Sequence, residues 1–217
     1  MKLDVGTLFA IAVPLGFVCG LLHFAFWLRW RERALLWWGA ADWVGTAGAL
    51  LLLSRAARVP GNTVLVASSL MVWAGFRCFA GQSLPLRAFA LATVAFLAGF
   101  LALRTLVPDL ALAVVYCSVA FGLIRAGMAL DLGRVQLPDP YRVRRLLAVM
   151  FVLHALFYLF RSTTAAILEA SAEFLDTGGL QAATLLFGLF DVLVWNLAAL
   201  WLVGHRRQLS RSVAPAA

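Results

Sequence analysis

The chain has 217 residues, of which 64% are hydrophobic and only 13% are charged, and its formal net charge is +8 at neutral pH. Its mean hydropathy is +0.94. A soluble domain of this length has too little interior to hide so much apolar surface. The composition therefore excludes a water-soluble globular protein and indicates a chain whose solvent is lipid.

Seven apolar segments fill almost the whole chain, and short loops separate them. Each has about the 20 mostly apolar residues that a helix needs to cross a bilayer core of roughly 30 Å. In chain order, the expected helices are 6–28, 34–53, 62–79, 86–106, 110–130, 143–168 and 180–204. We predict an all-α membrane protein, a bundle of seven transmembrane helices in residues 1–204, followed by a short basic cytoplasmic tail in residues 205–217.

Helices are favoured over strands because the apolar runs are too long and too continuous for barrel strands, which alternate over about ten residues. A helix also satisfies its own backbone hydrogen bonds, as lipid requires. The sequence shows no internal repeat, so the inverted halves of many transporters are not indicated. The first apolar run is too long for the core of a cleavable signal peptide, and we expect it to stay in the mature protein.

The basic residues predict the orientation, because loops on the cytoplasmic side are enriched in Lys and Arg. With the N-terminus outside, only Lys2, Arg55, Arg58, Arg104 and Arg161 stay on the outer side, out of 18 Lys and Arg. An odd number of helices then places the C-terminus inside. The expected location is the inner membrane of a bacterium, as a multi-pass protein. The scattered arginines do not indicate nucleic-acid binding.

The sixth and seventh expected helices carry polar residues that are costly in lipid and are therefore candidates for function. His154, Tyr158 and Arg161 are spaced i, i+4 and i+7, which puts them on one helical face. Asp191 and Asn196 lie in the seventh helix. Because consecutive helices joined by a short loop pack antiparallel, we expect His154 and Asp191 at a similar depth.

Two interpretations of this set stay open. The five residues form a buried polar pocket that binds a small polar ligand or responds to protons, since histidine titrates near neutral pH. Alternatively, Asp191 neutralises Arg161 or accepts a hydrogen bond from Tyr158 or Asn196, and holds two helices in register.

A second intramembrane acid, Asp42, lies in the second expected helix among tryptophans. We expect it to pair with an arginine on the inner side, such as Arg77 at the end of the third helix. Arg77 is also expected to act as an interfacial anchor that reaches phosphates or the last carbonyls of its own helix.

Several kinds of chemistry are excluded by what the sequence lacks. The only lysine is Lys2, outside the helices, so the expected helices contain no lysine that could form a Schiff base with retinal. Three histidines are too few for a multi-haem cytochrome, and a single haem between His23 and His154 is the remaining alternative. The three cysteines match no metal motif, and the sequence shows no protease, hydrolase or phosphate-binding motif. We expect no metal and no cofactor.

The second and third helices carry a recognisable pattern. Leu35-Leu36-Trp37-Trp38-Gly39 begins one apolar helix, and the next ends in a G-x-R-x-F-x-G pattern made by Gly75, Arg77, Phe79 and Gly81. Residues 20–85 resemble the seven-helix N-terminal membrane sensor region of bacterial GGDEF-type diguanylate cyclases. In that family the membrane region perceives a signal and a cytoplasmic domain makes cyclic di-GMP.

What the resemblance implies is limited by the end of the sequence, where no GGDEF motif follows Gly204. It therefore assigns no cyclase activity to this chain, which is expected to be non-enzymatic. The implied role is a sensor region separated from its output domain, or one that works through a partner. The candidate partners are membrane lipids, a cytoplasmic signalling partner or output domain, and a second copy of the chain.

The sequence thus favours a membrane sensor or signal-input module that acts by small helix shifts passed through the last helix. One alternative is a small transporter or channel-like carrier, with Asp42, Asp191 and Arg161 along a pathway and with helix one broken near Pro14. Another is an assembly or scaffold protein without a ligand.

The predicted orientation is tested with reporter fusions at two positions. Alkaline phosphatase, which is active only in the periplasm, should be inactive when fused after Leu209 and active when fused after Ser54, in the second expected loop. Green fluorescent protein at the same positions should give the opposite result. An active phosphatase at Leu209 would refute the predicted topology.

Overall fold

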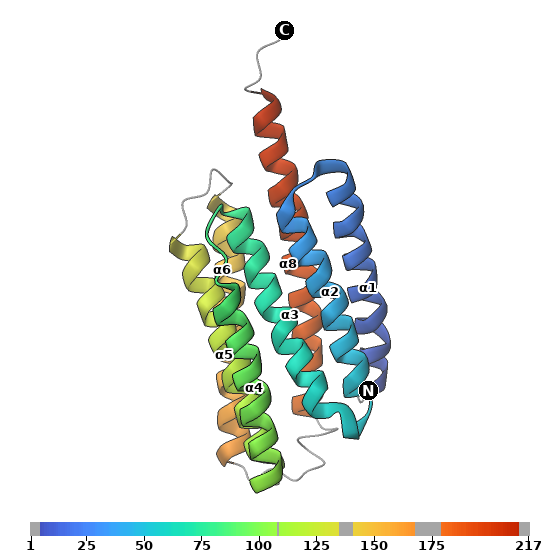
Figure 1. Ribbon diagram of the computed structural model, residues 1–217, viewed down its shortest axis with the longest axis vertical. Helices are drawn as coiled ribbons and strands as arrows, with labels where there is room; N and C mark the ends of the chain where they lie inside the picture. The colour runs from blue at the N-terminus through green and yellow to red at the C-terminus, as the bar shows by residue number, and fades with distance from the viewer. Residues whose placement is uncertain (1–4, 108, 135–140, 168–178, 213–217) are drawn as a thin grey trace.

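The structure is a computed structural model that describes residues 5–107, 109–134, 141–167 and 179–212. Its elements are α1 (Val5–Trp30), α2 (Arg33–Leu52), the short 3₁₀ turn η1 (Arg55–Ala57), α3 (Arg58–Phe79), α4 (Leu86–Leu106), α5 (Leu110–Arg134), α6 (Tyr141–Ile167) and α8 (Gly179–Ser212). Seven of these helices are long and apolar enough to cross a membrane. The prediction of an all-helical bundle is confirmed at this level (Figure 1).

The helix edges follow the apolar segments closely, with two informative differences. Helix α4 spans the predicted residues 86–106, whereas α3 begins four residues earlier than predicted, at Arg58. Pro60 and Gly61 therefore lie in the first turn of α3, where a missing N–H costs nothing because that turn has no intrahelical acceptor. Helix α8 continues to Ser212, so the segment predicted as a tail begins as helix.

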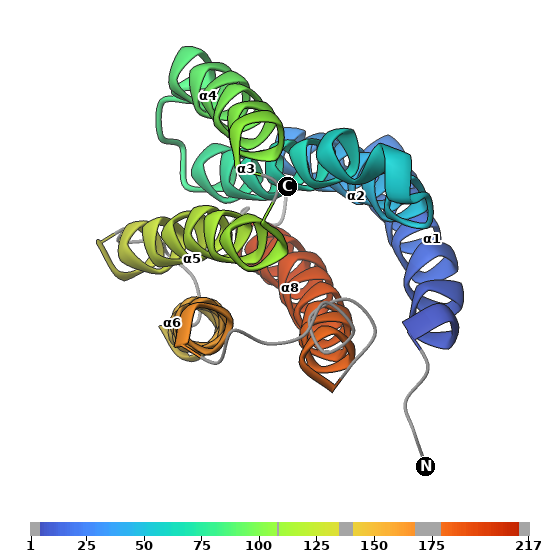
Figure 2. The ribbon, with the colours of Figure 1, turned by 90° about the horizontal axis from the view of Figure 1, so that it is seen from below.

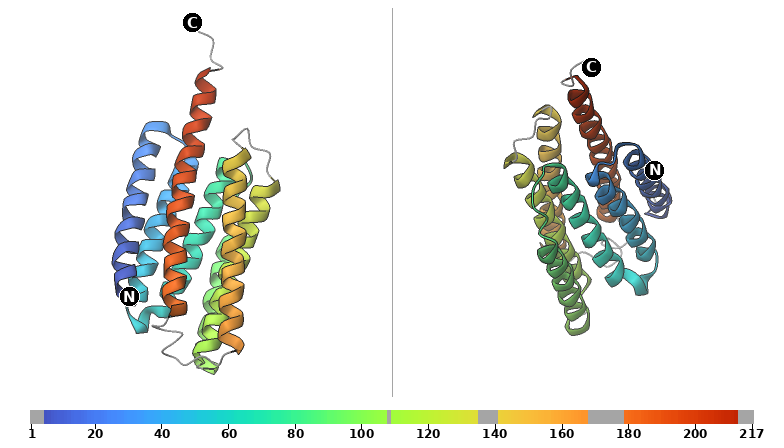
Figure 3. Two further views of the ribbon diagram at one scale, coloured as in Figure 1. Left: turned by 180° about the vertical axis from the view of Figure 1, so that it is seen from behind. Right: turned by 45° about the horizontal axis from the view of Figure 1, so that its top comes forward.

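The helices follow one another around the bundle in chain order, and consecutive helices run antiparallel. Helix α8 closes the bundle because it packs against both α1 and α6, as the views from below and from behind show (Figures 2 and 3). Helix α3 contacts α5 directly, which leaves α4 on the outside with only Phe96 and Phe100 buried. Helix α8 also extends beyond the other helices at the end that bears the C-terminus (Figure 1).

Helix α1 stays continuous through Pro14, so the break expected there is absent. Nearby, a Cβ added at Gly20 would overlap the indole of Trp43 on α2. The Trp43 indole N–H donates to the carbonyl of Phe17, 3.3 Å away. The glycine therefore serves close packing of α1 on α2, as small residues do between membrane helices.

The largest core cluster is centred on Trp38, which is fully buried between α2 and α3. Its ring meets Phe76 edge-on, with centroids 5.1 Å apart. Gly75 on α3 leaves the space that the indole fills, since a Cβ there would overlap it. Gly75 therefore allows the close approach of α2 and α3.

The end of α3 is fixed by Gly81, whose φ of 68° lies in the left-handed region. Its N–H donates to the carbonyl of Cys78 at 3.0 Å, and the Gln82 N–H donates to the carbonyl of Arg77 at 2.9 Å. This pair of bonds is a Schellman cap, which satisfies carbonyls that a helix end otherwise leaves open. Gly81 therefore acts as the stop of α3.

The packing at Gly75 is tested by Gly75→Ala, with Gly188→Ala as the matched control. The added methyl should lower the free energy of unfolding by about 1–3 kcal/mol, because the buried Trp38 ring must move. Gly188 lies inside α8 with no atom within 4 Å of an added Cβ, so its substitution should be neutral or stabilising. Unfolding by titration with SDS in mixed micelles measures both, and equal effects would refute the argument.

Candidate functional site

The first polar cluster joins three helices through the carboxylate of Asp191 on α8. Its Oδ2 lies 2.6 Å from a terminal guanidinium nitrogen of Arg125 on α5. Its Oδ1 lies 3.2 Å from Nδ1 of His154 on α6. All three side chains are buried, so a strong opposite charge is needed to hold the carboxylate in an apolar interior. The sequence expectation that His154 and Asp191 lie at one depth agrees with this geometry.

Aromatic rings surround the imidazole of His154. The ring of Tyr158 stacks on it with a centroid distance of 5.1 Å and an interplanar angle of 6°. Phe187 of α8 meets it edge-on at 5.6 Å, and Phe121 of α5 stacks on the other side of Tyr158. Tyr158 therefore belongs to the cluster as expected, through its ring face.

A second polar cluster forms around Asp42 on α2. Its Oδ2 lies 3.0 Å from Nδ1 of His23 on α1, and its Oδ1 accepts a hydrogen bond from the Asn196 amide on α8 at 3.2 Å. The His23 ring stacks on Trp195, with centroids 5.8 Å apart. Asn196 thus serves Asp42 and does not join the Asp191 cluster, which corrects the expected five-residue pocket.

The expected pairing of Asp42 with Arg77 is wrong. Arg77 donates to the carboxylate of Asp131 on α5 and, through Nε, to the carbonyl of Ser83 at 3.0 Å. The indole N–H of Trp73 shares the same Asp131 oxygen at 2.7 Å. Arg77 therefore ties α3 to α5, while the buried Asp42 is closer in depth to His23.

The backbone end of α3 is held by the last helix. A terminal nitrogen of Arg206 on α8 donates to the carbonyl of Phe79 at 2.6 Å, and the guanidinium carbon lies 3.6 Å from the centroid of the Phe79 ring. Another Arg206 nitrogen lies 3.8 Å from a carboxylate oxygen of Glu32, between α1 and α2. The G-x-R-x-F-x-G pattern thus connects α3 to both α5 and α8.

Arg161 does not contact Asp191, which corrects the expectation that the two neutralise each other. Its terminal nitrogens donate to the Ser118 hydroxyl on α5 at 3.1 Å and to the Gln181 amide oxygen on α8 at 3.2 Å. Arg161 and His154 share a face, but seven residues of helix rise separate them by about 10 Å along the axis. Arg161 therefore reaches the end of the bundle, whereas Asp191 lies deeper.

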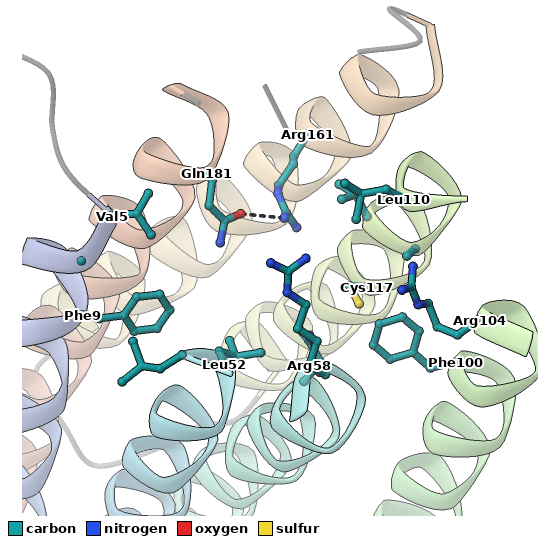
Figure 4. A pocket seen from close by; sticks show the side chains of 15 residues that line it. Val5, Phe9, Leu52, Arg58, Phe100, Arg104, Leu110, Cys117, Arg161 and Gln181 are labelled. Carbon is teal, nitrogen blue, oxygen red and sulfur yellow. Dashed lines mark hydrogen bonds between the residues drawn. The ribbon is translucent and has the colours of Figure 1, made fainter. Parts of the chain in front are cut away.

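Arg161 faces a cavity of about 320 Å³ at the bundle end that holds the first turns of α1, α3, α5 and α8. Arg58 of α3 and Arg104 of α4 also line it, and Figure 4 shows the guanidinium of Arg58 directed toward Arg161 and Gln181. The remaining wall is mostly apolar, with Phe9, Leu52, Phe100, Leu110 and Val114 among its residues. No carboxylate belongs to this wall within the described parts of the chain.

Sequence reasoning missed Arg125, Ser118, Gln181 and Arg206, and it considered His23 only as a haem ligand. From the sequence, Arg125 is explained as one of the inner-side charges that set the topology. It lies nine residues before the end of α5, and 8% of its surface is exposed. An arginine well inside an apolar span is itself a signal for a buried partner.

The two buried histidines take different carboxylates in different clusters, so neither cluster has the paired imidazoles of a haem site. Among the residues that the structure describes, no group of three or more His, Cys, Asp and Glu side chains is arranged to hold a metal ion.

Comparison of the chain with protein-family models, with curated proteins and with solved structures finds no match. The class that the fold defines is a seven-helix bundle of membrane-spanning length and apolarity.

The buried ion pair is tested by a double-mutant cycle on Arg125 and Asp191. Asp191→Leu alone should cost about 3–5 kcal/mol of unfolding free energy, because it leaves the Arg125 charge buried without its partner. Arg125→Met combined with Asp191→Leu should cost much less than the sum of the single changes. Unfolding with SDS in mixed micelles measures each variant, and additive losses would show that the two side chains do not interact.

Proposed function

We propose that the chain is a non-enzymatic signal-input module of the bacterial inner membrane, with its N-terminus outside and its C-terminus inside. It passes a change at its outer end through α8 to a cytoplasmic output domain or partner. The family resemblance of residues 20–85 favours this role, and the arrangement of polar contacts along α8 is the observation that carries it.

Helix α8 makes a polar contact to the rest of the bundle at four successive levels. Gln181 accepts from Arg161, Asp191 pairs with Arg125, Asn196 donates to Asp42, and Arg206 donates to the carbonyl of Phe79. We call this series the α8 ladder. At about 1.5 Å per residue it covers roughly 38 Å along the helix, which exceeds the thickness of a bilayer core.

The ladder suits signal transfer because its contacts are specific. The opposite face of α8 carries exposed apolar side chains, such as Phe190 and Leu197, that lipid solvates in any position. Helix association in lipid depends on close packing and polar bonds, since lipid tails give no hydrophobic drive between helices. A ligand that favours one arrangement of the contact between Gln181 and Arg161 therefore shifts the position of the whole helix.

The alternative function is a small-molecule carrier. A carrier needs polar groups along an open path, and broken helices commonly form its binding site. Here α1 is continuous through Pro14, and the cavity wall includes Arg161 but neither Asp42 nor Asp191. The two deeper clusters are packed among buried aromatic rings, which favours the signal-input role.

The proposal is tested by measuring whether a change at the Gln181 end of the α8 ladder moves the Arg206 end. Spin labels at Ser83 and Gln208, in a background without native cysteines, report the distance between the α3–α4 connection and the end of α8. Gln181→Leu should shift this distance distribution measurably in nanodiscs. Leu186→Ala, on the exposed face of α8, is the control and should leave the distribution unchanged.

An unchanged distribution in Gln181→Leu would overturn the proposed coupling. Solute or proton flux through proteoliposomes that depends on Asp191 would instead support the carrier.

A further inference from the structure

Arg161 is a buried cation whose partners among the described residues are neutral. Only 9% of its surface is exposed, and its hydrogen bonds go to a hydroxyl and an amide oxygen. Its Nε makes no hydrogen bond within the part of the chain that the structure describes. The other deeply buried arginine, Arg125, has the carboxylate of Asp191 at 2.6 Å. Arg161 has no such partner among the described residues, although an uncompensated charge is costly in an apolar interior.

The cavity beside Arg161 adds positive charge to this site. Arg58 and Arg104 reach its wall from α3 and α4, so three helices place guanidinium groups around one space (Figure 4). Asn62 and Gln181 add neutral hydrogen-bonding groups to the wall. Guanidinium groups bind carboxylate and phosphate oxygens through paired hydrogen bonds, and this geometry distinguishes arginine from lysine.

The apolar part of the wall indicates that the ligand also has an apolar part. Phe9, Phe100 and Leu110 belong to its apolar part. The volume of about 320 Å³ falls at the lower end of the range for small-molecule sites, roughly 300–1,000 Å³. A compact anion with an apolar body satisfies both parts of the wall, whereas a bare inorganic ion leaves the apolar part in contact with water.

We propose that this cavity binds a carboxylate or phosphate group carried on an apolar body, with Arg161 as the central contact and Arg104 as a second. The binding claim stands on the cavity alone. Its role as the signal rests on the proposed function, because Arg161 shares its hydrogen-bonding capacity with Gln181, the first contact of the α8 ladder. An anion that draws the guanidinium away from Gln181 loosens that contact.

The test uses the full chain in phosphatidylcholine nanodiscs and isothermal titration calorimetry. The probes are octyl phosphate and octanoate, with octanol as the uncharged analogue of the same length. Both anions should bind at least tenfold more tightly than octanol. Arg161→Gln should weaken their binding at least tenfold, and Arg161→Lys should retain part of it because the charge is kept without the planar fork.

Arg87→Gln is the matched control, since Arg87 is an exposed arginine at the opposite end of the helix that carries Arg104. It should bind the probes as the unchanged chain does. If Arg161→Gln does not fold, the test uses Arg104→Gln instead, which should weaken binding of both anions at least threefold. Anions that bind no better than octanol, or binding unchanged in the folded Arg161→Gln or Arg104→Gln protein, would overturn the proposal.

Two further arms distinguish the sources of the anion. Nanodiscs that contain phosphatidylglycerol should weaken octyl phosphate binding if a lipid head group occupies the cavity, and should not if the natural ligand is a free molecule. Inorganic phosphate alone should bind more weakly than octyl phosphate, and equal affinity would overturn the requirement for an apolar body. Failure of binding with intact coupling between positions 83 and 208 would overturn this inference and leave the signal-input proposal standing.

Discussion

The carboxylate of Asp191 is the constraint around which the bundle is arranged. It is buried on α8 between Arg125 of α5 and His154 of α6, and no apolar substitute can replace its charge without stranding the arginine. Lipid tails are as apolar as the side chains, so there is no hydrophobic drive that fixes the depth of one apolar helix against another. A buried ion pair fixes both the depth and the rotation of the three helices, since neither charge tolerates separation from the other. The stacked ring of Tyr158 then fills the space beside His154.

Polar contacts also constrain α8 above and below Asp191 in the sequence. Each end of the helix has a polar contact of its own, at Gln181 and at Arg206, and the middle has two. The contact at Gln181 is a weaker constraint than the central ion pair, because it joins the guanidinium of Arg161 to a neutral amide oxygen. At the other end, Arg206 has the carbonyl of Phe79 and, at 3.8 Å, a carboxylate oxygen of Glu32. A helix held firmly at its centre and more loosely at the Gln181 end can pivot about the centre, so a small displacement at that end produces an opposite displacement at the other. This is a physical reason to consider α8 a conduit, independent of any family resemblance.

The sequence predicted the helices well because crossing a bilayer requires a long apolar run, and such runs are visible without any tertiary information. It predicted the proximity of His154 and Asp191 from antiparallel connection and depth. It did not predict which helices face each other at each level, since that depends on helix rotation and on the order around the bundle. Asp42 contacts His23 on the preceding helix. Asn196 reaches Asp42 because α8 lies next to α1, which packs on α2. The sequence does not single out Arg125, because a basic residue near an inner loop is already explained as a topology signal.

The contrast between the two buried arginines is the reason to consider the cavity an anion site. Arg125 and Arg161 are buried to a similar degree, at 8% and 9% exposure, so both carry a similar desolvation cost. The chain compensates the first with a carboxylate at 2.6 Å and gives the second a hydroxyl, an amide and an open cavity. Neutral partners offset part of the cost of burying a guanidinium, while an anion offsets far more. Among the described residues the cavity wall holds arginines and no carboxylate, and the cavity has room for an added group, so the proposed anion has both a charge to pair with and space to occupy. Because Gln181 belongs to α8 and accepts a hydrogen bond from Arg161, the proposed occupancy of the cavity and the placement of the helix would be two aspects of one equilibrium.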